Sequence, residues 1–284
     1  MKKLIPFLIV PFFLILFYSC SKNELKQTKT RDREAAYSTN KEEDIRNYNL
    51  QVKESQAKQR TPYDTLSLLS YVLHNYPHGT YIVDFDKTLT FNIPKPAVIY
   101  VKKNNQLYIL SVIVRSKPGE RSVEPKNVVG YNQSFINLDS TKLGTAFFYL
   151  TLFQCENGTF NKIWEDPIPS HGGFNNISLK QWNYNNTQYV TVEFLDAQGI
   201  GHIDYNYFLI NGLTEMPHLL MTYKGIDFKR TLANVNNDKY PDYYEFVYYN
   251  LAKKIYEKDS VAFVWNKKDS LYFNTRNHHQ TRPY

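Results

Sequence analysis

Short apolar runs rich in Val, Ile, Tyr, Phe and Thr recur along this chain from residue 80 onward. Clusters typical of turns separate them: Asn104-Asn105, Lys117-Pro118-Gly119, Glu156-Asn157-Gly158 and Asn266-Lys267-Lys268-Asp269. Such runs, without helical periodicity, predict β-strands. The expected strands are Thr80–Val83, Ala97–Val101, Gln106–Val114, Thr145–Leu152, Tyr189–Phe194, Tyr205–Ile210, Tyr243–Tyr249 and Val261–Trp265.

One helix is predicted directly before the first strand. Pro62 and Asp64 precede the segment Thr65–Asn75, and Asp64 is placed to cap its first turn. Gly79 ends the connection to the first strand. We therefore expect an all-β, antiparallel fold with one short N-terminal helix.

A weak internal repeat bears on the arrangement of the strands. Residues 194–204 align with residues 232–242 at an offset of 38, which matches Asp196 with Asn234 and Asp204 with Asp242. This offset is close to the length of a four-stranded propeller blade. A β-sandwich with long hairpins would carry the same signals, so propeller-like and sandwich-like arrangements both stay open.

The N-terminus has the order of charges and apolar residues that is typical of an export signal. Lys2 and Lys3 precede an uncharged apolar run, Leu4–Tyr18. A membrane-spanning helix needs about 20 apolar residues, and Pro6 and Pro11 would each remove a backbone donor within this one. Residues 1–19 are therefore predicted to be a signal peptide.

Cys20 closes the apolar run, and Ser19 precedes it. This sequence resembles the lipobox of bacterial lipoproteins, although Phe17 and Tyr18 are bulkier than the lipobox norm. The resemblance implies cleavage before Cys20 and acyl chains on it, and two such chains hold a protein stably on a membrane. Ser21, in place of Asp, favours the outer membrane. The bias toward Asn, Lys, Tyr and Ile makes the chain similar to lipoproteins of Bacteroidota.

Two further segments follow the signal peptide. Residues 20–61 are polar, mixed in charge and nearly free of large apolar residues, so we expect a flexible tether. Residues 62–284 are long enough to form a single β-rich domain with its own core.

The net charge and the predicted export limit the classes of partner that the chain can bind, and the cysteine content bears on how the domain is stabilised. The net charge of +7 could suit nucleic acid, but export places the chain where little nucleic acid is met. The expected partners are the membrane, through the lipid, and an unidentified protein or glycan. Once Cys20 is acylated, Cys155 has no partner for a disulfide, so the core must hold the domain together.

One loop carries oxygen side chains at alternate positions. Residues 234–242 resemble the Asp-x-Asn-x-Asp-Gly-x-x-Asp calcium loop of FG-GAP and VCBS repeats in a degenerate form. Alternate side chains of a tight loop converge on one point, which gives a hard cation its oxygen ligands. The resemblance implies calcium ligands at Asn234, Asn236, Asp238, Tyr240 (through its carbonyl) and Asp242.

The loop departs from the calcium pattern in ways that favour a metal-free turn as the alternative. Lys239 stands where Gly normally makes the sharp turn, so a left-handed residue with a Cβ and a repelling ammonium are expected there. Glu245 falls on the twelfth position, where EF-hands place a bidentate Glu. In the first copy of the repeat, Ile200 replaces a ligand, so that copy is not expected to bind.

An enzymatic motif is also present. Tyr81–Thr90 is similar to the first motif of haloacid dehalogenase-type phosphatases, which implies Asp84 as nucleophile, Asp86 as the residue that handles the leaving-group proton, and magnesium to offset the charge. That chemistry needs a parallel strand followed by helices, and the chain continues instead into Pro-broken β segments. We therefore keep the phosphatase only as an alternative.

Aromatic residues are abundant, with 24 Tyr and 18 Phe in 284 residues. Trp164, Trp182 and Trp265 are candidates for an exposed platform that would suit sugar rings or a protein. Core and cross-strand packing is the favoured interpretation for them, because aromatic residues are favoured in strands anyway. The sequence thus favours a lipid-anchored cell-envelope protein that binds or supports a partner without catalysis. A glycan-binding module of a surface assembly is the second interpretation.

Overall fold

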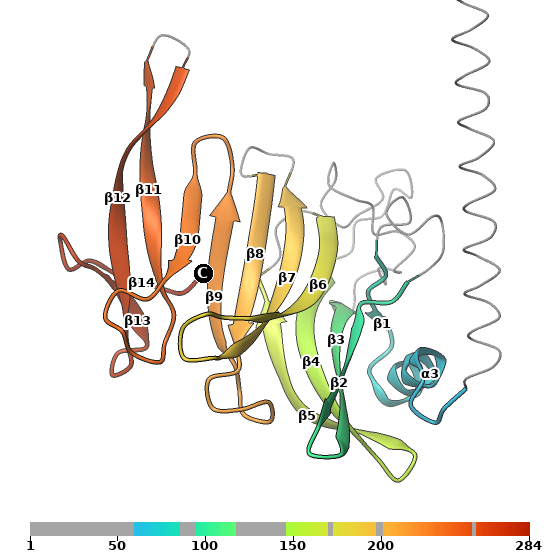
Figure 1. Cartoon of the computed structure of the whole chain (residues 1–284). Helices are drawn as coiled ribbons and strands as arrows, with labels where there is room; N and C mark the ends of the chain where they lie inside the picture. The colour runs from blue at the N-terminus through green and yellow to red at the C-terminus, as the bar shows by residue number, and fades with distance from the viewer. Residues whose placement is uncertain (1–59, 86–94, 118–145, 170–172, 197–200, 252–253) are drawn as a thin grey trace, which may run out of the picture. The chain divides into compact units, whose positions relative to one another are not determined.

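A computed structural model describes residues 60–85, 95–117, 146–169, 173–196, 201–251 and 254–284 (Figure 1). The chain divides into two compact units, residues 1–60 and 61–284, and the description below concerns the second. The predicted signal peptide, Cys20 and the tether up to residue 59 lie outside the described residues. No helix among the described residues is long and apolar enough to cross a membrane.

The single helix that the structure describes, α3, spans Thr65–Asn75 as predicted. Asp64 caps it, because its Oδ1 accepts a hydrogen bond from the backbone N–H of Ser67 at 2.8 Å. Leu68 and Val72 form its buried face.

The first sheet has five antiparallel strands (Figure 1). The strands are β1 (Thr80–Ile82), β2 (Val98–Lys103), β3 (Gln106–Ser116), β4 (Ala146–Glu156) and β5 (Thr159–Ile168). β3 is central: β4 pairs along one edge, and β2 and β1 share the other. Asn104-Asn105 and Asn157-Gly158 make the two-residue turns before β3 and β5, and all four residues have positive φ, as tight hairpins require.

The second sheet is a continuous meander of nine strands, in the order β14-β13-β12-β11-β10-β9-β8-β7-β6. Its strands are β6 (Gly173–Gln181), β7 (Gln188–Asp196), β8 (Gly201–Phe208), β9 (His218–Lys224), β10 (Lys229–Ala233), β11 (Asp242–Leu251), β12 (Lys254–Asn266), β13 (Leu271–Asn274) and β14 (Gln280–Thr281). β9 and β10 pair only beside their turn, and farther along β9 the N–H of Met221 donates to the carbonyl of Pro283. The C-terminal residues thus pair with the part of β9 that β10 does not reach.

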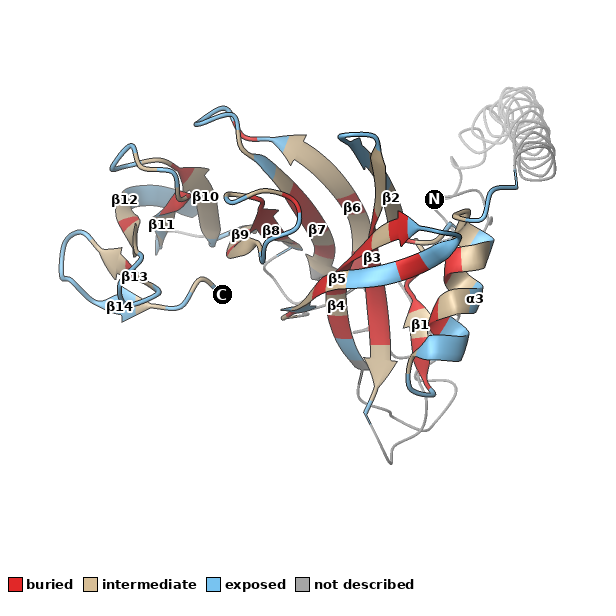
Figure 2. Cartoon of the chain, turned by 90° about the horizontal axis from the view of Figure 1, so that it is seen from below, coloured by how far each residue is buried: buried red, intermediate tan, exposed pale blue. Residues whose placement is uncertain are grey.

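Buried residues of the described part form three clusters. The largest lies between the two sheets and includes Leu110, Val112, Leu150, Leu152 and Trp164 from the first and Val190, Val192, Phe194, Tyr205 and Tyr207 from the second. The second cluster joins α3 to β1, β3 and β4 through Leu68, Val72, Ile82, Ile113 and Phe153, and Figure 2 shows the buried side of α3 turned toward the sheet. The third runs along the meander from the end of β6 to β13 and consists of Trp182, Phe208, Leu220, Tyr243, Phe263 and Tyr272.

The predicted fold class is confirmed: the chain is all-β and antiparallel with one short helix, and its two packed sheets are the sandwich-like alternative. The eight predicted strands are present, but β5, β6, β9, β10, β13 and β14 were not expected. These strands are short, or carry charged and Asn residues that weaken the apolar pattern. β5, for example, contains Lys162, Glu165 and Pro167 on a sheet edge, where such residues are tolerated.

The two copies of the weak repeat form hairpins, β7–β8 and β10–β11, but their registers differ. Asp196 still pairs with Gly201, whereas pairing in the second hairpin stops at Ala233 and Asp242. The aligned residues Asp204 and Asp242 therefore face different partners, Glu193 and Ala233. The repeat does not correspond to equivalent positions in the sheet.

Candidate functional site: a groove on the β11–β12 arm

The hairpin of β11 and β12 extends beyond the neighbouring strands of the second sheet (Figure 1). We call residues 244–251 and 254–261 the arm. At its base Tyr243 and Phe263 are buried, and their rings stack at a centroid distance of 4.6 Å. Farther out, large apolar side chains are exposed: Val247 43%, Tyr249 44%, Leu251 61%, Ile255 39% and Tyr256 42%. The outer arm therefore belongs to none of the three buried clusters.

Contacts between its own side chains order the arm. Tyr249 and Tyr256 face each other across the ladder and stack at 5.5 Å and 23°. The register shifts after Val247, where Lys258 is an extra residue on β12, and such a bulge increases the twist of the ribbon. Lys229 of β10 lies 3.9 Å from the centroid of the Phe246 ring and 3.6 Å from Glu257.

A groove of about 620 Å³ runs along the arm and the tip of the β9–β10 hairpin. This volume falls in the range of small-molecule sites. The groove is lined by Asp227, Phe228, Glu245, Phe246, Val247, Tyr248, Tyr249, Asn250, Ile255, Val261, Phe263 and Asn274. Aromatic and aliphatic side chains thus form its walls, with two carboxylates and two amides among them.

Glu245 is a polar group of the groove that two neighbouring strands hold in place. Its Oε1 accepts a hydrogen bond from the Tyr223 hydroxyl at 2.9 Å, and its Oε2 lies 3.4 Å from Nη2 of Arg230. Burial raises the pKa of Tyr223 to about 12, so the phenol keeps its proton and remains the donor. The Glu245 side chain is still 36% exposed and therefore presents an oriented acceptor to the groove.

Arg230 sits behind Glu245, with only 10% of its side chain exposed. Its guanidinium lies 4.3 Å from the centroid of the Tyr243 ring and 5.0 Å from that of Tyr223. The two rings attract the cation, which offsets part of the cost of burying it. Arg230 therefore offsets the negative charge of Glu245 from the buried side of the carboxylate, and the other side faces the groove.

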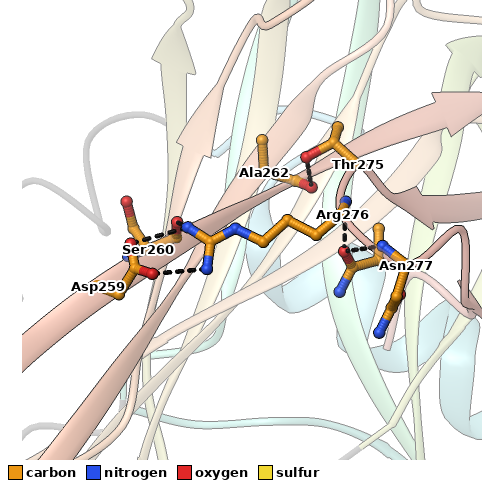
Figure 3. A network of polar contacts seen from close by, with 7 residues as sticks. Asp259, Ser260, Ala262, Thr275, Arg276 and Asn277 are labelled. Carbon is orange, nitrogen blue, oxygen red and sulfur yellow. Dashed lines mark hydrogen bonds and ion pairs between the residues drawn. The ribbon is translucent and has the colours of Figure 1, made fainter.

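A second ion pair fixes the middle of the arm (Figure 3). Arg276, after β13, donates from Nη2 to Asp259 Oδ1 at 2.8 Å and to the carbonyl of Ser260 at 2.8 Å, and its Nη1 also reaches Asp259. The hydrogen bonds that the Asp259 carboxylate accepts from Arg276 and from the backbone N–H of Ser260 lower its pKa to about 2. Thr275 adds a bond from its hydroxyl to the carbonyl of Ala262. The segment after β13 thereby ties β12 to the rest of the domain.

The loop of residues 234–242 lies at the opposite end of β11 from the arm tip. Asp242 is fully buried, and its carboxylate accepts three backbone N–H bonds, from Val235, Asn236 and Trp265. Burial nevertheless raises its pKa. Asp238 accepts from the N–H of Tyr240 and from the amide of Asn236. The loop is therefore closed by hydrogen bonds of its Asp and Asn side chains.

Two details of this loop differ from the expectation. The left-handed residue is Asn237, with φ 59°, and not Lys239, because Asn tolerates this conformation better than other residues with a Cβ. The Lys239 ammonium donates to Oδ1 of Asn211 at 2.9 Å and so is held away by a partner outside the loop. Glu245 does not join the loop either, since it binds Tyr223 and Arg230.

The loop residues fit a cation in one respect. Oδ1 of Asn234 is buried and has no hydrogen-bond partner among the described residues. The oxygens of Asp238 and Asp242 accept hydrogen bonds, but a carboxylate oxygen has lone pairs for more than one contact. The described residues contain no group of three or more His, Cys, Asp or Glu that could hold a metal.

The tryptophans pack as the favoured core interpretation predicts and form no exposed platform, with Trp265 partly buried beside the third cluster. Trp164 and Trp182 are each 5% exposed and belong to the buried clusters, and Nε1 of Trp164 donates to the carbonyl of Leu213 at 2.8 Å. Trp265 packs against His218 at 4.4 Å and Tyr272 at 5.0 Å. Burial among these rings lowers the pKa of His218 to about 4, so it is neutral.

The phosphatase motif has the wrong surroundings. β1 pairs with β3 in antiparallel fashion, and Asp84 forms an antiparallel bridge to Pro96, whereas the phosphatase needs a parallel strand. Phe85 packs on Phe174 at 5.4 Å, as expected for a residue that faces the core. Asp86 lies outside the described residues.

Other buried polar groups serve the fold. Thr191, Asn206 and Thr222 are joined by side-chain hydrogen bonds across β7, β8 and β9, at 3.1 and 2.9 Å. Cys155 is a free, buried thiol, and burial raises its pKa to about 11, which leaves it protonated and unreactive.

Sequence reasoning did not find the groove. The apolar run Tyr243–Tyr249 predicted a strand, but nothing in it shows that its outer half is uncovered. A signal was available in the length of the apolar and aromatic stretch from Tyr243 to Tyr256, which is longer than a sheet of average depth requires.

Comparison of the chain with known protein families, with curated proteins and with solved structures gives no match.

Proposed function

We propose that this protein is a lipid-anchored binding module of the cell envelope, with the groove on the arm as its binding site. The observation that carries the proposal is the exposure of Val247, Tyr249 and Leu251 on a hairpin that extends beyond the sheet. Exposed apolar side chains grouped around a concavity are typical of interaction sites.

Binding without catalysis is the interpretation that suits Glu245 best. Both of its oxygens are held by neighbours, Tyr223 and Arg230, and a carboxylate so paired is a fixed hydrogen-bond acceptor rather than a group poised to take a proton. The phosphatase alternative loses support because Asp84 bridges antiparallel to Pro96.

Photo-crosslinking in cells tests the site. Tyr249→p-benzoylphenylalanine is expected to give a discrete adduct with an envelope component, because position 249 lines the groove. The same replacement at Tyr184, which is 48% exposed but outside the groove lining, is the matched control. Adding Phe228→Ala on the groove wall is expected to reduce the adduct at 249. No adduct at 249, or equal adducts at both positions, contradicts the proposal.

The anchor is proposed from the sequence, since Cys20 ends the apolar run of an export signal. In cells fed a labelled fatty acid, the protein is expected to carry the label and to sediment with membranes. Cys20→Ala is expected to lose the label and to accumulate as the uncleaved precursor. An unlabelled wild-type protein, or a Cys20→Ala variant that is cleaved and membrane-bound like the wild type, contradicts anchoring.

We also propose calcium as a ligand of the 234–242 loop. The buried Oδ1 of Asn234, which has no hydrogen-bond partner among the described residues, supports this proposal. The Lys239 ammonium supports it as well, because its bond to Asn211 holds the positive charge away from the loop oxygens. Asn234, Asn236, Asp238, Tyr240 and Asp242 would supply the oxygens, and extracytoplasmic calcium is abundant enough for a weak site. The ion would link the start and the end of the loop.

Thermal unfolding tests this ligand. Calcium at roughly ten times its dissociation constant is expected to raise the melting temperature by about 3–5 °C, because it binds only the folded loop. Asp238→Ala is expected to abolish the shift, whereas Asp269→Ala, which changes an exposed turn with similar side-chain bonds, is expected to keep it. A melting temperature that does not respond to millimolar calcium excludes the site.

A further inference from the structure

We infer that the groove on the arm binds a neutral carbohydrate chain, with Tyr249 and Phe228 as stacking surfaces and Glu245 as a fixed acceptor for sugar hydroxyls. The inference rests on the proposed binding function and names its ligand class. It is carried by the charges, hydrogen-bonding groups and aromatic rings of the groove, each of which excludes another class of ligand.

The charge of the groove disfavours an anionic ligand. The chain as a whole has a net charge of +7, yet the described residues that line the groove include Asp227 and Glu245 and neither lysine nor arginine. A phosphate, a uronate or a nucleic acid would find no lysine or arginine among these lining residues to pair with and would meet the exposed carboxylate of Asp227, since that of Glu245 is already paired with Arg230.

The pairing of Glu245 disfavours a cationic ligand. Arg230 lies 3.4 Å from Glu245 Oε2 and already offsets its charge, so a cation would gain little by approaching it. The remaining lone pairs of Glu245 can still accept hydrogen bonds, which is what the hydroxyl of a neutral sugar offers.

Amide groups add donors to these acceptors. The Oδ1 of Asn274 accepts from the N–H groups of Arg276 and Asn277, which fixes the side chain and leaves its Nδ2 group as a donor. Asn250 lines the groove as well and is exposed. A ligand rich in hydroxyls, each both donor and acceptor, matches such a mixed lining, whereas a purely apolar ligand would leave it unsatisfied.

The aromatic rings provide flat apolar surfaces beside these polar groups. Phe228 is 52% exposed and Tyr249 is 44% exposed. Tyr256 stacks on Tyr249 from across the ladder and orients its ring, so little conformational freedom is lost on binding. The Tyr249 ring held in this way, with Phe228 as a second exposed ring, presents a face to the C–H side of a sugar while the sugar hydroxyls reach the carboxylate and the amides.

The groove follows a strand, which suits an extended chain. Residues 245–250 of β11 all line it, and five steps along a strand cover about 17 Å. A ligand lying along the arm would meet Glu245 first, then Val247, and Tyr249 near the tip.

Affinity electrophoresis tests the inference. The mature chain, made unlipidated by Cys20→Ser, is run in native gels that contain a neutral glucan, mannan, galactan or xylan, or anionic pectate. We expect at least one neutral polysaccharide to slow the wild type. Tyr249→Ala is expected to weaken that binding roughly tenfold, the effect of losing one aromatic stack. Tyr249→Phe and Tyr184→Ala are expected to bind like the wild type, and Glu245→Gln more weakly.

The other outcomes overturn the ligand class. If no neutral polysaccharide of the panel slows the protein, or if Tyr249→Ala leaves the retardation unchanged, the groove does not bind a neutral glycan. Retardation by pectate alone that survives Tyr249→Ala reports only the basic charge of the chain. In each of these cases the crosslink at position 249 separates the two proposals: an adduct preserves the binding site with a different ligand, and its absence removes both.

Discussion

The apolar contact between the five-stranded sheet and strands β6–β8 is the interaction on which the rest of the domain depends. Leu110, Leu150 and Leu152 from one side and Val190, Val192 and Tyr205 from the other are fully buried in it. One face of β6–β8 is thereby fixed, and Leu219, Met221 and Tyr223 of β9 still pack against its edge. Farther outward the smaller third cluster holds the meander. Strands far from the first sheet are thus free to carry a surface that packs against no other part of the described domain.

The arm is possible because its base is secured. A two-stranded ribbon is marginally stable in water by itself. Here Tyr243 stacks on Phe263 at the base, and Arg276 joins Asp259 and Ser260 farther out. Beyond this ion pair the ribbon contributes little to the cores, so the chain maintains exposed tyrosines without weakening its fold. The side chains that stabilise the domain and those that the outer arm exposes are thus different residues, and we interpret this as the physical basis of a binding module.

The sequence predicted the parts of this structure that local chemistry determines. Asp64 capped the helix, and Asn104-Asn105 and Asn157-Gly158 made hairpins, because each depends on residues adjacent in the chain. The groove could not be predicted in this way. Phe228 and Tyr249 come together only because β9, β10 and β11 are neighbours in one sheet, and Glu245 is oriented by Tyr223 and Arg230 from two other strands. For the tryptophans, the sequence pattern could not distinguish a buried side chain from an exposed one, since aromatic residues favour strands in both cases.

The claim that the exposed tyrosines of the outer arm do not stabilise the core is tested most directly by the free energy of unfolding of the double variant Tyr249→Ala/Tyr256→Ala. If the claim holds, urea unfolding should show that the free energy of unfolding falls by less than about 1 kcal/mol, the size of one cross-strand aromatic pair. Phe153→Ala, which empties a buried site under α3, should cost about 3–5 kcal/mol in the same assay. A loss from the arm variant as large as that from Phe153→Ala would show that these tyrosines belong to the core and would contradict the account.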